Sequence, residues 1–192
     1  MNNFYFHNPT KILFGKEAIN NLADQLQEYG ANILLAYGGG SIKRNGIYDE
    51  VIKILEEEDK NIFELSDIMP NPRRKKVDEG IKICKEEDID FILAVGGGSV
   101  IDCSKAVAAG AQTNQDFWQK YFINGADCQE ATPLGTILTL AATGSEMDAG
   151  CVVTDWEDNA KYSYSSEKLF PQFSILDPTY TYTVPQDHTI YG

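Results

Sequence analysis

The sequence predicts an α/β protein with a doubly wound, mostly parallel sheet and a small β-hairpin. Short apolar runs alternate with amphipathic segments along the chain as far as about residue 112. The apolar runs lack in/out alternation, which is typical of strands buried on both faces of a parallel sheet. Two of the runs also end in three glycines and a serine, so the sheet contains two related β-strand-to-helix units.

The strands and helices follow in order. The expected strands are residues 11–14, 32–37, 61–65, 91–95, 136–140 and 174–176. Apolar side chains recur at helical spacing within 19–29, 48–55 and 77–84, and small residues continue a helix through 105–111. Residues 117–122 predict a short aromatic helix or turn, and 152–154 with 162–164 predict a hairpin. Residues 179–192 show no clear element.

Composition restricts the class of partner. A net charge of -13 argues against nucleic acid and anionic membrane surfaces, which are held mainly by Lys and Arg. The basic run 73–76 is interpreted as the solvated first turn of a helix. The chain shows neither a signal peptide nor a membrane-spanning run, and its four cysteines form no C-x-x-C pair. We therefore expect a cytoplasmic protein with reduced, mostly buried thiols.

The two glycine turns are the candidate functional site. Gly96, Gly97 and Gly98 follow a buried strand, and their backbone can approach a ligand closely with N–H groups directed at it. Ser99 adds a hydroxyl where the next helix begins, and Asp102 follows one turn later. A tight turn without a ligand is the alternative for a single such sequence. The recurrence at Gly38, Gly39, Gly40 and Ser41 favours phosphate binding.

Three separate motifs carry a resemblance to a known family. They are Pro70-Asn71-Pro72, the glycine turn with Asp102, and residues 139–146 (TLAATGSE). In this order they resemble the iron-dependent (group III) alcohol dehydrogenases, in particular the NADPH-dependent butanol dehydrogenases and aldehyde reductases. The resemblance runs from about Tyr5 to Gly192. It implies a Rossmann-like cofactor domain over 1–192, with a core at about 11–176, and a connection at 177–192 to an all-helical domain absent from this chain.

The resemblance also implies roles for individual residues. Gly97, Gly98 and Ser99 would hold the pyrophosphate, and Asp102 would lie near the nicotinamide riboside. Asn71, Thr139 and Thr143 would line the adenosine and phosphate side, and Lys161 would reach a cofactor ribose. Each has a structural alternative: Asn71 can cap a turn, Thr139 can fill a strand, Thr143 can belong to a capping box, and Lys161 can be an exposed hairpin lysine.

The first glycine turn indicates which dinucleotide is preferred. NAD-preferring relatives place an acidic residue after the corresponding strand, where it binds the ribose 2′-hydroxyl and repels a 2′-phosphate. Here Gly38 to Ser41 occupies that position, with Lys43 and Arg44 close by. Backbone donors, a hydroxyl and two cations suit a 2′-phosphate, so we expect NADP(H) in preference to NAD(H).

The expected chemistry is hydride transfer between the nicotinamide and an alcohol or aldehyde polarised by a divalent metal, iron or zinc. In the family, one aspartate and three histidines hold the metal in the helical half, and the ligands are expected beyond Gly192. Neither His7 nor His188 is assigned to a metal, so the fragment is expected to bind cofactor without catalysing. A nucleotide- or sugar-phosphate-binding module without redox activity is the alternative. Phe4-Tyr5-Phe6 predicts a strand that either pairs across a homodimer interface or folds back as a sheet edge.

Overall fold

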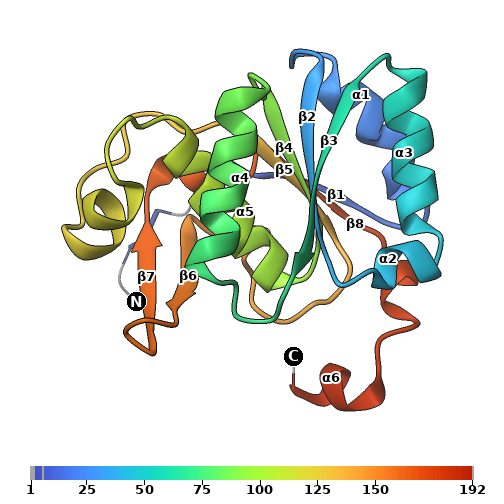
Figure 1. Ribbon diagram of the computed structural model, residues 1–192. Coiled ribbons are helices and arrows are strands. Elements are labelled where there is room, and N and C mark those ends of the chain that lie inside the picture. The colour runs from blue at the N-terminus through green and yellow to red at the C-terminus, as the bar shows by residue number, and fades with distance from the viewer. Residues whose placement is uncertain (1–2, 6, 192) are drawn as a thin grey trace.

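The computed structural model describes residues 3–5 and 7–191, and a six-stranded parallel sheet forms its centre (Figure 1). The strand order is β1-β8-β5-β4-β2-β3, and every pairing is parallel. The strands are β1 (Lys11–Phe14), β2 (Asn32–Gly38), β3 (Asn61–Ile68), β4 (Phe91–Gly96), β5 (Leu134–Leu138) and β8 (Phe173–Leu176). The doubly wound α/β fold predicted from the sequence is therefore confirmed.

Two helical layers cover the sheet. One face carries α4 (Arg74–Glu86) and α5 (Gly98–Ala111), and the other carries η1 (Ala18–Asn21), α1 (Leu22–Leu26) and α3 (Ile47–Glu57) (Figure 1). Alternate residues of each central strand serve the two cores. In β4, Ile92 and Ala94 pack with α4 and α5, whereas Phe91, Leu93 and Val95 pack with α1 and α3. Burial on both faces explains why the strands appear in the sequence as continuous apolar runs.

Smaller elements lie outside the sheet. The hairpin predicted from the sequence is formed by β6 (Gly150–Asp155) and β7 (Ala160–Ser165), which pair in antiparallel register. The hairpin packs against α5. The expected aromatic segment is a π-helical turn, η2 (Trp118–Ile123). The remaining elements are α2 (Ser41–Arg44), η3 (Glu167–Leu169), η4 (Pro178–Thr181) and α6 (Gln186–Tyr191).

Three expectations about elements were wrong in detail. The segment 19–29 divides into η1 and α1 instead of forming one helix, and residues 139–140 lie beyond the end of β5. Residues 179–192, expected to be irregular, contain part of η4 and α6. Tyr180 anchors this segment, because its hydroxyl donates to Glu50 Oε2 at 2.7 Å. Because Tyr180 and Glu50 are 130 positions apart, no local sequence pattern predicts this contact.

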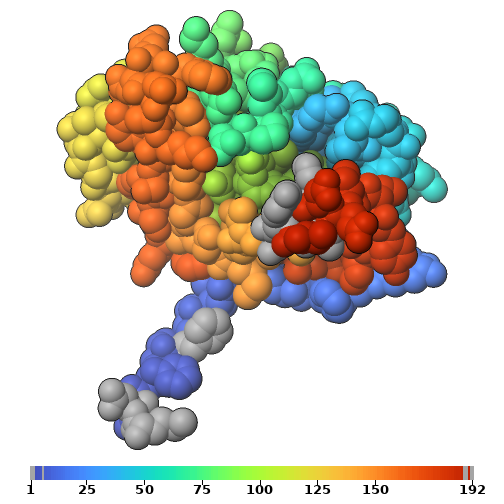
Figure 2. Space-filling view, turned by 90° about the horizontal axis from the view of Figure 1, so that it is seen from below, coloured from blue at the N-terminus to red at the C-terminus, as the bar shows by residue number. Residues whose placement is uncertain are grey.

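Of the two alternatives for the N-terminal strand, the fold-back as a sheet edge is not formed by the residues that the structure describes. Phe4 and Tyr5 belong to no strand and are each 88% exposed, while Phe6 lies outside the described residues. The N-terminal segment stands away from the body of the protein (Figure 2). The cysteine expectation is confirmed: all four thiols are free and buried, and burial raises the pKa of Cys84 and Cys103 to about 12. In the part of the chain described, no helix is long and apolar enough to cross a membrane.

Candidate functional site

The two glycine turns meet at one edge of the sheet. From β2 the chain passes to β3 on one side and returns to β4 on the other, so the carboxyl ends of β2 and β4 flank a topological switch point. Ligands of open α/β sheets bind in the crevice at such a point, because the connections diverge there. Gly38 ends β2 and Gly96 ends β4, which places both turns at this crevice.

A groove of about 440 Å³ occupies the crevice. It contains seven of the residues singled out from the sequence: Gly38, Gly39, Ser41, Gly97, Gly98, Ser99 and Thr139. The groove also contains residues that sequence reasoning missed, namely Tyr180, Thr183, Val184 and Pro185. Figure 2 looks onto this edge of the molecule, where the C-terminal segment (red) lies beside the helices that follow β2 (blue). No local signal marks these residues, because the fold alone brings them to the groove.

Glycine is required at Gly98 by close packing. A Cβ atom there would overlap the Thr143 hydroxyl and lie 3.1 Å from Thr143 Cβ. Gly98 is also the first residue of α5, and the first N–H groups of a helix have no partner within the helix. A turn without side chains therefore leaves these donors and the positive end of the α5 dipole facing the groove. Gly40 is needed for its conformation instead, since its φ is 87°.

Ser99, Asn71 and Lys161 form a connected cluster beside the second turn. The Asn71 N–H donates to Ser99 Oγ at 3.2 Å, and Lys161 Nζ donates to Asn71 Oδ1 at 2.5 Å. Asn71 adopts a left-handed φ of 55°, which asparagine tolerates better than most residues. The expected roles of Asn71 and Lys161 thus fall on residues from two distant segments that touch each other and the glycine turn.

Asp102 and Thr143 lie in an adjoining hollow of about 340 Å³. Asp102 Oδ1 accepts from Ser145 Oγ at 2.9 Å, and Oδ2 accepts from the Val152 N–H at 3.0 Å. Thr143 Oγ1 lies 2.9 Å from Ser145 Oγ, which connects it to the same carboxylate. Burial raises the pKa of Asp102, although these two donors and Lys105 act in the opposite direction. Both oxygens of Asp102 therefore already accept hydrogen bonds, one from the loop before β6 and one from β6 itself.

The first turn has a more complex charge environment than the sequence suggests. Glu64 of β3 accepts hydrogen bonds from the hydroxyls of Tyr37 and Tyr48, and its carboxylate lies 3.6 Å from Lys43 Nζ. Burial by itself would raise the pKa of Glu64, but the tyrosine hydrogen bonds and Lys43 outweigh it and lower the pKa. Lys43 is thus paired with Glu64. Arg44 Nη1, by contrast, lies 3.8 Å from the position of a Cβ on Gly40, directly over the turn.

The described side chains form no site for a metal ion. Among the residues whose side chains are described (3–5, 7–187 and 190), no group of three or more His, Cys, Asp or Glu residues is placed to hold a metal ion. The residues present therefore do not fit the metal that the resemblance implies, and no catalytic step through a metal is derived for this chain.

Comparison with known proteins identifies the family. The model of the iron-containing alcohol dehydrogenases matches residues 9–178. The chain belongs to this family. Probable NADH-dependent butanol dehydrogenase 1 of Bacillus subtilis (strain 168) is 54% identical over 192 residues, which are 100% of this chain and 49% of the relative. NADPH-dependent aldehyde reductase YqhD of Escherichia coli (strain K12) is 43% identical, again covering 100% of this chain and 49% of the relative.

Solved structures agree with the sequence comparison. The crystal structure of NADH-dependent butanol dehydrogenase A from Thermotoga maritima superposes with a TM-score of 0.95 at 42% identity, covering 100% of this chain and 48% of that one. The chain thus spans about half the length of the curated relatives it matches. The relationship to alcohol dehydrogenases, which are oxidoreductases, is confirmed. The relatives' names divide between NADH and NADPH.

Proposed function

We propose that this chain is the cofactor-binding half of a metal-dependent alcohol dehydrogenase or aldehyde reductase and that it binds NADP(H) in preference to NAD(H). The observation that carries the proposal is the groove between β2 and β4, which two glycine turns enter from neighbouring strands. A dinucleotide has two phosphates to place at a helix N-terminus and an adenosine to place beside it, which matches two adjacent turns.

Different residues around the two turns would bind different parts of the cofactor. Gly97, Gly98 and Ser99 would hold the pyrophosphate at the start of α5, with Thr139 and Thr143 on the loop facing them. Asn71 would line the adenosine and phosphate side, Asp102 would lie near the nicotinamide riboside, and Lys161, which donates to Asn71 Oδ1, would reach a cofactor ribose. When bound, the nicotinamide supplies or accepts the hydride. The contribution of this chain is to bind and orient it.

The preference for NADP(H) rests on the first turn. Residues 38–41 bring no acidic side chain to the ribose, and Arg44 lies over Gly40. Glu64 opposes the preference, because it places a carboxylate beside Lys43. The proposed 2′-phosphate site therefore uses Arg44, Ser41 and the turn amides, whereas the charge of Lys43 is largely offset by Glu64.

A fluorescence titration with NADPH, NADH and ATP tests the proposal. We expect NADPH to bind at least about tenfold more tightly than NADH, a difference of about 1.4 kcal/mol. Arg44→Gln should remove most of this preference and leave the affinity for NADH nearly unchanged. Equal affinities for NADPH and NADH would sink the preference, and ATP binding tighter than both would favour the nucleotide-phosphate module instead.

Catalysis belongs to the whole enzyme in this proposal. The substrate class is an alcohol or aldehyde, as the names of the relatives suggest, and the metal is held by residues that this chain does not supply. The 192-residue chain should therefore show no aldehyde reduction with NADPH in the presence of Zn²⁺ or Fe²⁺. Turnover dependent on either metal would contradict this assignment.

Dimer formation through the N-terminal segment is part of the same proposal. Phe4 and Tyr5 expose large apolar side chains on a segment that stands away from the body (Figure 2). Analytical sedimentation of the chain and of a Phe4→Ser/Tyr5→Ser variant measures the fraction of dimer in each. A dimer that the double variant does not weaken would contradict the N-terminal contact.

A further inference from the structure

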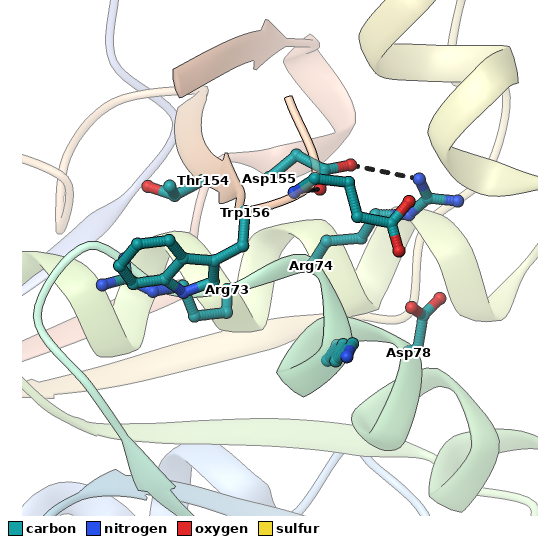
Figure 3. Close-up of a pocket in the computed structure, with 8 residues that line it drawn as sticks. Arg73, Arg74, Asp78, Thr154, Asp155 and Trp156 are labelled. Carbon is teal, nitrogen blue, oxygen red and sulfur yellow. Dashed lines mark hydrogen bonds and ion pairs between the residues drawn. The ribbon is translucent and has the colours of Figure 1, made fainter. Parts of the chain in front are cut away.

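The basic run 73–76 does more than the solvated helix turn expected from the sequence. Arg74 is the first residue of α4, and its side chain is 29% exposed. Its Nη1 lies 3.1 Å from Asp155 Oδ2, and the Asp155 side chain is only 6% exposed (Figure 3). The guanidinium also lies 5.1 Å from the centre of the Trp118 ring. Arg74 is therefore a half-buried, paired cation at the junction of α4, the hairpin and η2.

Asp155 connects the end of β6 and the hairpin turn to α4. Its Oδ2 pairs with Arg74, while its Oδ1 accepts from the Glu157 N–H at 2.9 Å, which fixes the start of the hairpin turn. The same edge carries a second attachment. Thr154 forms a bridge with Arg73, and its N–H donates to Pro72 O at 2.8 Å. Figure 3 shows Arg73, Arg74, Asp155 and Trp156 gathered around one pocket. The Arg73 guanidinium carbon lies 4.5 Å from the centre of the Trp156 ring.

Strand alternation links this junction to the cofactor groove. Cys151, Val153 and Asp155 face inward and are buried, so the hairpin packs through that face. Thr154 lies on the opposite face, where its cross-strand partner is Lys161. Lys161 reaches Asn71 Oδ1 from there. Asp155 is adjacent to Thr154 in β6 and pairs with Ala160, the neighbour of Lys161, so a displacement of Asp155 moves Lys161 relative to the turn at Ser99.

We propose that Arg74 and Asp155 are positioning residues for the dinucleotide groove, whose ion pair holds the hairpin so that Lys161 meets Asn71. This inference rests on the proposed function, because it assigns Lys161 to the cofactor. Arg74, Asp155 and Lys161 do not line the groove itself. Lys161 is connected through Asn71 to Ser99, which lines the groove, so Arg74 and Asp155 act through Lys161. The exposed pair Lys82–Glu86 on the same helix provides a matched control, since its side chains are 71% and 59% exposed.

Hydrogen exchange without cofactor tests the positioning directly. In Arg74→Gln, amides of residues 150–165 should exchange at least about tenfold faster, because the variant leaves the Asp155 carboxylate buried without its cation. Arg74→Lys should restore part of the protection, and Lys82→Gln should leave it unchanged. Unchanged exchange over 150–165 in Arg74→Gln would overturn the proposal whether or not the chain binds a dinucleotide.

Cofactor titration then tests the route through Lys161. Arg74→Gln should raise the Kd for NADPH by about 3- to 10-fold, and Lys161→Met by about tenfold or more, the range for a hydrogen bond to a charged group. In the Lys161→Met background, Arg74→Gln should add less than about twofold, since residues in one network are not additive. An equal effect of Arg74→Gln in both backgrounds would show a general loss of structure and overturn the proposal. Failure of the wild-type chain to bind NADPH or NADH would instead refute the proposed function, and hydrogen exchange would still decide the positioning.

Discussion

Replacing Lys105 by methionine should destabilise this fold more than any surface lysine could. The Lys105 side chain is fully buried in α5, one helical turn after Asp102. Its Nζ donates to Asp148 Oδ1 at 2.7 Å, to Asp148 O at 2.7 Å and to Gly150 O at 2.9 Å. These three bonds fix the loop that enters β6 and also presents Ser145 to Asp102.

The magnitude follows from what the substitution leaves behind. Removing one partner of a fully buried ion pair costs about 3–5 kcal/mol, because an unpaired charge remains in the interior. Here the remaining carboxylate, Asp148, is 52% exposed and can be hydrated, so that cost is reduced. The carbonyls of Asp148 and Gly150 each lose a charged donor, at about 1–1.5 kcal/mol apiece. Methionine keeps the apolar volume of the stem. We expect a loss of about 2–3 kcal/mol in the free energy of unfolding.

Urea unfolding followed by circular dichroism measures this difference. The control is Lys82→Met on the exposed face of α4, where the change should stay below about 0.5 kcal/mol. A loss below about 1 kcal/mol for Lys105→Met, or one equal to that of Lys82→Met, would refute the reasoning. It would mean that the hydrogen bonds of Lys105 only balance the cost of burying the ammonium.

Two further predictions concern the second glycine turn and the hydrogen bonds of Asp177. Gly98→Ala should weaken dinucleotide binding by about tenfold and destabilise the fold by about 1–3 kcal/mol, since its Cβ would collide with Thr143. Gly39→Ala, where nothing lies within 4 Å of the new Cβ, should leave the urea midpoint nearly unchanged, and equal midpoint shifts would contradict this account. Burial would raise the pKa of Asp177, but hydrogen bonds from Thr179 and from the Glu17 N–H outweigh it and lower the pKa. The stabilisation is therefore present above the unfolded-state pKa and lost as pH falls through the folded-state pKa. Asp177→Asn should cost about 1–2 kcal/mol at pH 7, and the difference from the wild type should shrink as the pH falls below about 4 in urea titrations. A constant difference from pH 7 to pH 2.5 would exclude the charge as the cause.

Most of the sheet could be predicted because its signals are local. Strands such as β2 and β4 appear as apolar runs, and the glycines that follow them have a conformational or packing requirement that only glycine meets. The amphipathic period of α3 and α4 places those helices within a few residues of their observed bounds. For the strands and helices, the neighbours that determine the structure lie within one turn of helix or one strand length, whereas the packing requirement at Gly98 comes from the distant Thr143.

The predictions that failed concern residues whose partners are distant in the sequence. Tyr180 belongs to the groove through its contact with Glu50, and Arg74 is half-buried and paired because Asp155 comes from the hairpin. Lys43 appeared in the sequence as a cation available for a 2′-phosphate, yet Glu64 of the neighbouring strand pairs with it. Charge, exposure and pairing are properties of the environment, and single-sequence reasoning assigns them only from near neighbours.

The sequence by itself determined the fold class, the two glycine turns and the resemblance to a dehydrogenase family, because each depends on residue type and spacing along a short stretch of chain. Only the tertiary structure decided that both turns open into one groove, that Asn71 joins Lys161 to Ser99, and that Arg74 holds the hairpin that carries Lys161. The parallel strand order brings the two glycine turns to the same edge of the sheet. The β6–β7 hairpin is a separate sheet, and its packing against α4 and α5 is what brings Lys161 to Asn71 and Asp155 to Arg74. The physical reason is that hydrogen bonds and ion pairs form between neighbours in space, whatever their separation in the sequence.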